Sequence, residues 1–241
     1  MDESRPMTKR ELKALRRLEK LDTNQEESKQ NKIKWILLAG GSLLFLAFFG
    51  FLIFLAKQGN ARPAVIIAPN GHVRGLETAT LALVEYGDFQ CPACKTYHPI
   101  VREVLAAYDG RLKLVFKHFP LTSVHPNAAP AALSAEAAGA QGKFFEMHDI
   151  LYERQSEWAG LTPAHAQEKF ISYARQLKLD EEKFTEDIKN KELEGIVRAH
   201  QEEGIENGVS STPTFFLNGK IIQNPRSVDE FKKLIDEELK R

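Results

Sequence analysis

The chain has 241 residues, of which 43% are hydrophobic and 27% charged, and its 33 Lys and Arg balance its 33 Asp and Glu. This balance gives no global nucleic-acid signature, and the composition is that of an ordinary globular protein. Its two cysteines cannot form the multi-bridge framework of small secreted domains, and a chain of this length can bury a core without one.

An uncharged apolar stretch runs for 22 residues from Trp35 to Ala56. As a helix it rises roughly 33 Å at ~1.5 Å per residue, which is enough to cross a hydrocarbon core of about 30 Å. A buried core helix is the alternative, but a helix apolar on every face suits lipid better. A cleaved signal peptide would have a shorter apolar region, of about 7 to 15 residues. The sequence therefore predicts one N-terminal transmembrane helix that remains as a signal anchor.

The charges around this stretch predict its orientation. Three lysines precede it at 29, 32 and 34, whereas only Lys57 and Arg62 follow it closely. The positive-inside rule therefore predicts a cytoplasmic tail over residues 1–34 and an extracytoplasmic remainder, in a single-pass protein of the cell membrane. Residues 57–79 are then a linker with a possible first strand, and residues 80–241 form the main domain.

The main domain begins with a strand, a helix and a strand. Residues 80–86 are apolar and β-branched, residues 95–110 have helical spacing, and residues 111–119 predict a second strand. This order predicts a parallel βαβ unit. A helical block of about five helices is expected over residues 126–207. The domain closes with a hairpin at Asn218-Gly219 and an amphipathic helix, with Ser227 as N-cap and Glu230 at the capping-box position.

Both cysteines lie in Cys91-Pro92-Ala93-Cys94, between the first strand and the first helix of this domain. Cys91 at the mouth of the helix faces unsatisfied backbone N–H groups and the positive end of the helix dipole, which favour the thiolate. In such motifs the cysteine pKa falls from about 8.5 to roughly 3.5–7.5. We therefore expect Cys91 to be an exposed nucleophile and Cys94, one turn further, to be the shielded resolving thiol.

Two other uses of the pair are less consistent with the sequence. A structural zinc site usually needs four ligands, and His98, His118 and His125 lack the compact spacing of a ligand pair, so we expect no metal site. A structural disulfide across so small a ring would contribute little loop entropy. We expect the histidines, His148 included, to be packing or surface residues. The only redox group that the sequence indicates is the Cys91–Cys94 disulfide itself, without another cofactor.

A second motif strengthens the redox interpretation. Thr212-Pro213 stands just before the strand of the hairpin, where a proline can adopt a cis peptide bond and present the Thr212 backbone to an extended substrate. Together, VEYGDFQCPAC and STPTFFLNG resemble the thioredoxin superfamily. The helical block resembles the DsbA-like branch, and the sequence between the two motifs, from VFKHFPLTSVHPNAAPAA onward, looks like its extracytoplasmic, often membrane-anchored bacterial members. The resemblance covers roughly residues 64–241 and implies an α/β thioredoxin fold with an inserted helical block.

The resemblance also implies roles for individual residues. Cys91 matches the nucleophile, Cys94 the resolving thiol, and Pro213 the cis-proline beside the disulfide, with Thr212 before it. Glu85 matches a buried acid that assists proton transfer from the resolving cysteine, although a plain strand-edge carboxylate remains the alternative. A lysine on the neighbouring strand, either at 113 or at 117, is expected to pair with Glu85.

The direction of electron transfer stays open. The strong oxidant of the family has a histidine immediately before its second cysteine, where this chain has Ala93. Losing that imidazole should make the pair a milder oxidant, on a scale from about −270 mV for a reductant to about −120 mV for a strong oxidant. Thr212 before the proline also looks more like thioredoxins and isomerases.

The sequence thus predicts an extracytoplasmic protein thiol–disulfide oxidoreductase that introduces disulfides into exported proteins through Cys91 and Cys94. The resemblance implies reoxidation by a quinone-linked membrane partner, DsbB-like or VKOR-like. A disulfide reductase or isomerase of the same fold is one alternative. A non-catalytic peptide-binding chaperone module, in which the cysteines are incidental, is the other.

Overall fold

The computed structural model describes residues 48–51 and 70–240. The chain divides after Arg62 into two units, and residues 70–240 belong to the second, Pro63–Arg241. Residues 48–51 are helical and lie in the predicted membrane span. The rest of that span, the tail and residues 57–69 lie outside the described residues. Among the helices of the described part, none combines the length and the apolar character needed to cross a membrane.

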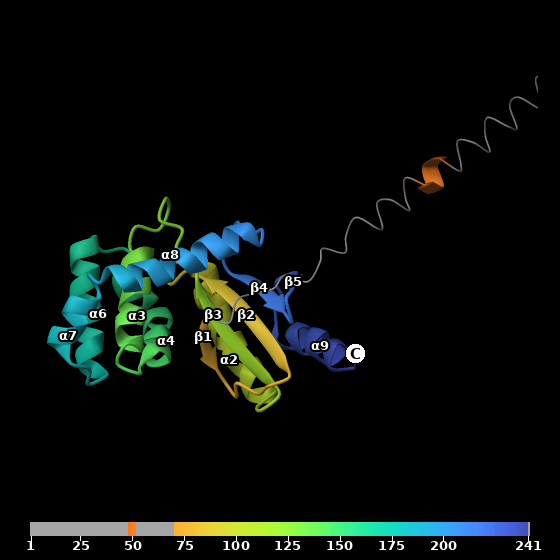
Figure 1. Cartoon of the computed structure of the whole chain (residues 1–241), viewed down its shortest axis with the longest axis horizontal. Coiled ribbons are helices and arrows are strands. Elements are labelled where there is room, and N and C mark those ends of the chain that lie inside the picture. The colour runs from red at the N-terminus through yellow and green to blue at the C-terminus, as the bar shows by residue number, and fades with distance from the viewer. Residues whose placement is uncertain (1–47, 52–69, 241) are drawn as a thin grey trace, which may run out of the picture. The chain divides into compact units, whose positions relative to one another are not determined.

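A five-stranded mixed sheet is the centre of the second unit, with the strand order β1-β3-β2-β4-β5 (Figure 1). Strands β2 and β3 are parallel, as the βαβ prediction requires, and the other neighbours are antiparallel. Strand β1 lies in the stretch 57–79, where a first strand was expected, and pairs with β3. The strands span His72–Arg74 (β1), Leu81–Gly87 (β2), Leu112–His118 (β3), Thr214–Leu217 (β4) and Lys220–Ile222 (β5).

The helices follow the predicted order, with one difference in the inserted block. Six helices, instead of about five, lie between β3 and β4, because α4 ends at Glu153 and a separate helical turn, α5, begins at Gln155. In Figure 1, α3, α4, α6 and α7 gather beside the sheet, and α8 runs from them back to it. The helices span Pro92–Ala107 (α2), Ala128–Gly139 (α3), Phe144–Glu153 (α4), Gln155–Trp158 (α5), Pro163–Gln176 (α6), Glu181–Asp187 (α7), Lys191–Glu206 (α8) and Val228–Leu239 (α9).

The two faces of the sheet have separate cores, because successive strand residues point to opposite sides. Leu83 and Leu114 belong to the core that contains residues of α2 and α9. Val84 and Tyr86 belong to the core on the other face, where Gly204 of α8 comes close to Tyr86. Residue parity along β2 therefore decides which helices a side chain can meet.

The closing ββα segment agrees with its turn signals. Asn218 and Gly219 have φ values of 48° and 77°, and a two-residue turn with both φ positive is type I′. Ser227 accepts a hydrogen bond from the backbone N–H of Glu230, as an N-cap should. The capping-box prediction was wrong in one detail. A capping box has the Glu230 carboxylate accept from the N–H of Ser227, whereas here it accepts from the N–H of Arg226, one residue before the N-cap.

Candidate active site

The two cysteines are unbridged and lie at the start of α2, directly after the loop that follows β2. Cys91 is the N-cap residue and Pro92 the first residue of the helix. The expectation that Cys91 is exposed was wrong: only 7% of it is accessible, while Cys94 is fully buried. The exposed residues of the motif are Pro92 and Ala93. The accessible edge of the pair is therefore small, and it belongs to Cys91.

The segment before β4 covers Cys91. The Thr212–Pro213 peptide bond is cis, in agreement with the resemblance. The Cys91 sulfur lies 3.5 Å from the backbone carbonyl oxygen of Thr212, to which the thiol donates a hydrogen bond while it is protonated. This contact joins residues that are 121 positions apart and explains the burial of Cys91. It also puts the Thr212 backbone at the reactive sulfur, where an extended peptide would meet it.

The two thiols have opposite acidities. A hydrogen bond from the Cys94 thiol lowers the pKa of Cys91 from its ordinary value of 9.0 to about 5, against burial and with help from Thr212 and from the first backbone amides of the helix. Burial raises the pKa of Cys94 well above its ordinary value, and the neighbouring Cys91 and Glu85 raise it further. At neutral pH Cys91 is therefore a thiolate and Cys94 a thiol.

Glu85 lies on β2 in the layer beneath the cysteines. It is 2% exposed, and burial raises its pKa from 4.5 to about 8. Its Oε1 atom makes no hydrogen bond within the described residues, and the same holds for the buried hydroxyl of Tyr152. Both groups are close enough to Cys94 to interact with it electrostatically. Glu85 therefore carries a proton at neutral pH, and its Oε1 atom is not engaged by another group of the described residues.

Neither lysine pairs with Glu85, so that prediction was wrong. In the parallel register Glu85 lies opposite Phe116, whereas Lys113 and Lys117 lie opposite residues 82 and 86. Both lysines therefore point to the other face of the sheet. Lys113 donates to the backbone carbonyl of Glu77, and Lys117 is paired with Glu203 at 2.6 Å. The sequence identified β3 correctly as the strand next to Glu85, but it chose residues of β3 whose side chains point to the opposite face.

Side chains that the sequence did not indicate hold the loop before Cys91. Asp88 is buried and accepts hydrogen bonds from the backbone N–H groups of Gln90 and Leu121, at 2.7 and 2.9 Å. The Gln155 amide donates to the backbone carbonyls of Phe89 and Cys91, at 2.8 and 2.9 Å. Gln155 is the first residue of the extra turn α5. The break between α4 and α5 therefore lies at the residue that contacts this loop. The contact of Asp88 with Gln90 is local, but no sequence pattern signals the contacts with Leu121 or Gln155, because those partners are 33 to 66 residues away.

The histidines are mostly interior residues, as expected. His98, His118 and His148 are buried, and His125 lies 2.7 Å from the Asp88 carboxylate. The structure nevertheless brings metal-ligating groups together that the spacing did not reveal. Two clusters of three such side chains occur in the described part of the chain: His72, His118 and Glu136, and His98, His148 and Asp149.

Comparisons with known families and structures place the fold of this chain among thioredoxin-like proteins. A family model described as Thioredoxin matches residues 68–237. Oxidised BdbD from Bacillus subtilis is 25% identical, with a TM-score of 0.64, and the match covers 75% of this chain and all of that one. The thiol-disulfide exchange protein α-DsbA2 from Wolbachia pipientis is 20% identical, with a TM-score of 0.61, over 70% of this chain and 87% of that one. The second likeness shows the fold alone; together the matches support thiol–disulfide exchange in general terms.

Curated relatives match over part of their length. The Na⁺/H⁺ antiporter NhaA 3 of Salinispora tropica is 41% identical over 175 residues, which are 72% of this chain and 26% of that protein. NhaA 1 of Salinispora arenicola is 46% identical over 151 residues, which are 62% of this chain and 22% of that protein. The chain thus spans about a quarter of the length of these relatives. Their names describe those longer proteins.

The hydrogen bond between the two thiols can be tested by substitution. Cys94→Ala removes the donor to Cys91, whereas Cys94→Ser keeps a hydroxyl donor of similar size. We expect the pKa of Cys91 to be about 5 in the reduced protein, to rise in Cys94→Ala, and to rise less in Cys94→Ser. The pH dependence of Cys91 alkylation by iodoacetamide measures all three. Equal pKa values in the two variants would contradict the role of the donor.

Proposed function

Because the chain belongs to the thioredoxin family whose model matches residues 68–237, we propose that it introduces disulfides into exported proteins through Cys91 and Cys94. The observation that carries this proposal is the opposite acidity of the two thiols, with the pKa of Cys91 lowered to about 5 and that of Cys94 raised. A staple or a packing pair needs no such difference. A redox-active dithiol uses both the low pKa of one thiol, which makes it a good leaving group, and the high pKa of the other, which keeps it protonated.

The exchange has two steps. A substrate thiolate attacks Cys91 of the oxidised pair, so that a mixed disulfide forms and the Cys94 sulfur leaves with an electron pair and takes up a proton. A second substrate thiolate then attacks the substrate sulfur of the mixed disulfide, which releases Cys91 as a thiolate. The substrate is oxidised by two electrons, and the enzyme pair is reduced. Cys91 leaves readily because its conjugate acid has a low pKa.

Glu85 is proposed to exchange the proton of Cys94. Cys94 is fully buried, so bulk water does not reach it directly. With a pKa of about 8 and an unpartnered Oε1, Glu85 is protonated at neutral pH yet can lose its proton without breaking an ion pair. It can therefore donate a proton to Cys94 when the disulfide opens and accept it when the disulfide forms again.

The proposed direction of exchange is based on the stability of the reduced form. A thiolate at Cys91 stabilises the reduced pair, and this stabilisation makes a disulfide a better oxidant. The exposed methyl group of Ala93 adds no hydrogen bond or charge to this effect, so we propose an oxidant milder than the strongest members of the fold. A reductase or isomerase of the same fold remains the second candidate, supported by Thr212 before the cis-proline.

We further propose that residues 35–56 anchor the protein, with the tail 1–34 in the cytoplasm and the catalytic domain outside it. The support is the uncharged apolar stretch and the three lysines before it. An anchored domain would be held near a quinone-linked membrane protein, which is the class of partner proposed to reoxidise the pair. Exported or unfolded proteins with free thiols are the proposed substrates.

Oxidative refolding of a reduced, disulfide-containing substrate tests the activity. We expect Cys91→Ser to abolish catalysed disulfide formation, because no sulfur is left to form the mixed disulfide. Thr96→Ala is the matched control: it is exposed on the same helix, and we expect it to keep full activity. Full activity in Cys91→Ser would instead support the non-catalytic chaperone module.

The role of Glu85 is tested by Glu85→Gln, which keeps the shape and removes the titrating proton. We expect the exchange rate to fall on the order of 10²-fold. The wild-type rate should also change with pH around 8, and this dependence should be missing from the variant. Stopped-flow measurement of Cys91–substrate exchange provides both values. An unchanged pH profile would contradict proton transfer by Glu85, even if the rate fell for structural reasons.

The proposed topology has a separate test. A reporter enzyme that works only in an oxidising, extracytoplasmic compartment is fused after Arg241. We expect it to be active in the full chain and inactive when residues 35–56 are deleted. Activity of a reporter that works only in the cytoplasm would contradict the topology and the redox proposal with it.

A further inference from the structure

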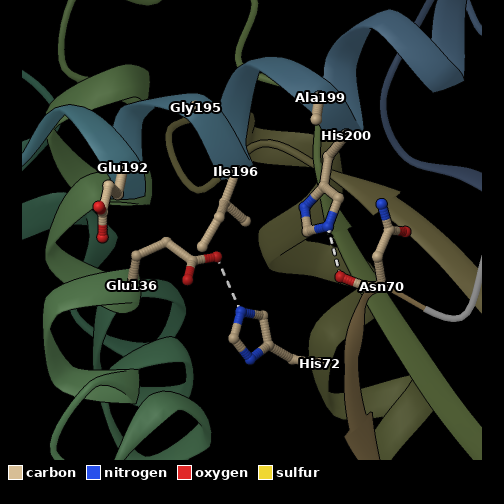
Figure 2. A pocket seen from close by; sticks show the side chains of 8 residues that line it. All are labelled: Asn70, His72, Glu136, Glu192, Gly195, Ile196, Ala199 and His200. Atoms are coloured by element: carbon tan, nitrogen blue, oxygen red, sulfur yellow. Dashed lines mark hydrogen bonds and ion pairs between the residues drawn. The ribbon is translucent and has the colours of Figure 1, made fainter.

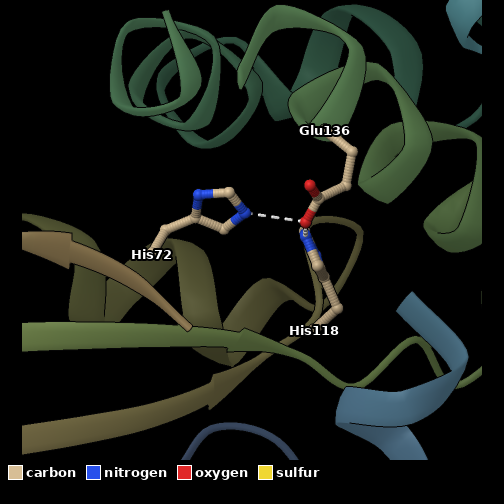
Figure 3. Close-up of side chains that lie close together, drawn as sticks. All are labelled: His72, His118 and Glu136. Carbon is tan, nitrogen blue, oxygen red and sulfur yellow. Dashed lines mark hydrogen bonds and ion pairs between the residues drawn. The ribbon is translucent and has the colours of Figure 1, made fainter. Parts of the chain in front are cut away.

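Three potential metal ligands from separate elements meet between the sheet and α3 (Figure 3). His72 comes from β1, His118 from the end of β3, and Glu136 from α3. The Nε2 atoms of His72 and His118 lie 2.7 and 2.8 Å from the same oxygen, Oε1 of Glu136. All three donor atoms lie within 4.8 Å of one another. Two imidazoles therefore converge on one carboxylate oxygen.

We propose that His72, His118 and Glu136 bind a divalent transition-metal ion, with Zn²⁺ as the expected occupant. Two imidazole nitrogens and one carboxylate oxygen suit a metal of borderline softness, whereas Ca²⁺ and Mg²⁺ prefer oxygen ligands alone. Tetrahedral zinc with bonds of ~2.0–2.2 Å separates neighbouring donors by ~3.3–3.5 Å. The observed contacts must widen by only about 0.6 Å, which side-chain rotation can supply.

A pocket of about 460 Å³ gives this cluster access to solvent. His72 and Glu136 line it, and α8 forms another wall with Ile196 and His200 (Figure 2). The side chains of His118 and Glu136 are nearly inaccessible, at 1% and 4%, whereas that of His72 is 26% exposed. The site is thus fixed at its base and open on one side. Three protein ligands with an open fourth position are typical of zinc sites that keep a water or bind a small ligand.

Few hydrogen bonds other than those between the three side chains would be broken when these ligand atoms bind a metal. Without metal, each imidazole must carry its proton on Nε2 to donate to Glu136, so two donors share one acceptor oxygen. A metal ion would replace both of these hydrogen bonds. Nδ1 of His118 makes no hydrogen bond within the described residues, so metal binding at Nε2 breaks none there.

The second cluster is a poorer cation site. Its carboxylate, Asp149, already accepts a hydrogen bond from the Arg74 guanidinium at 2.8 Å. His98 Nε2 is 3.8 Å from Asp149, and a second arginine, Arg102, lies close enough to affect the His98 pKa. A fixed positive charge in contact with the carboxylate opposes a second cation there. Within the described part of the chain, no arginine or lysine forms an ion pair with Glu136, whose charged partners are His72 and His118.

A metal at this position would join the sheet to the inserted helical block. Its three ligands are separated by 46 and 18 residues along the chain and belong to a sheet edge, an interior strand and a helix. Because the unfolded chain has no preformed site, metal binding would stabilise the folded state. We therefore expect Zn²⁺ to raise the thermal midpoint of the protein.

Calorimetric titration of the full chain with ZnCl₂ tests the proposal. The protein carries no histidine tag and is oxidised, so that Cys91 and Cys94 offer no thiols to the metal. We expect one Zn²⁺ per chain, with an affinity at least about tenfold weaker in Glu136→Gln and in His72→Gln. His165→Gln, at an exposed histidine outside the cluster, is the matched control and should bind as the wild type does.

The outcomes separate the alternatives. No binding by the oxidised wild type, or unchanged affinity in both ligand variants, would overturn the proposal. Loss of binding in Asp149→Asn, but not in Glu136→Gln, would move the site to the second cluster and also overturn it. Zn²⁺ should raise the thermal midpoint of the wild type but not that of His72→Gln, whose partly exposed side chain can be replaced without opening the core. Circular dichroism verifies that each variant is folded.

Discussion

The hydrogen bond between the Cys94 thiol and the Cys91 sulfur is the interaction on which the chemistry of this site depends. Two identical groups lie one helical turn apart, yet the pKa of one is lowered to about 5 and that of the other is raised. Burial alone would raise both. The difference arises because Cys91 receives the donor and the first amides of α2, while Cys94 provides the donor from a fully buried position. The loop contacts of Asp88 and Gln155 maintain this geometry.

Two polar side chains near Cys94, those of Glu85 and Tyr152, are buried, and each has an oxygen atom that contributes no hydrogen bond to the described fold. Unpaired buried polar groups are costly and call for an explanation. The proposed proton exchange with Cys94 would account for Glu85, because a carboxyl group with a strong partner would hold its charge too firmly to titrate near neutral pH. Burial disfavours the charged form of Glu85, and the same burial brings the pKa of this carboxyl group close to neutral pH.

Much of the fold could be predicted from local patterns in the sequence. The βαβ unit, the Asn218-Gly219 turn and the motif at Cys91 depend on residues close together in the chain, and the structure agrees with them. The predictions that were wrong concern residues whose partners are distant in the sequence. The incorrect pairing of Glu85 with a lysine could be avoided only with the strand register. Gln155 of α5 contacts a loop residue 64 positions away, and the cover over Cys91 comes from Thr212, which is 121 positions away. The cluster at Glu136 was missed for the same reason.

The central claim is that the Cys91–Cys94 pair is poised to donate a disulfide, and its reduction potential tests this most directly. Equilibration of the full chain with glutathione redox buffers, followed by quantification of the Cys91–Cys94 disulfide, gives the value. The stabilised Cys91 thiolate predicts a potential well above that of a reductant, near about −150 mV but below the roughly −120 mV of a strong oxidant. A potential near about −270 mV would contradict the account and assign the protein to the reductases.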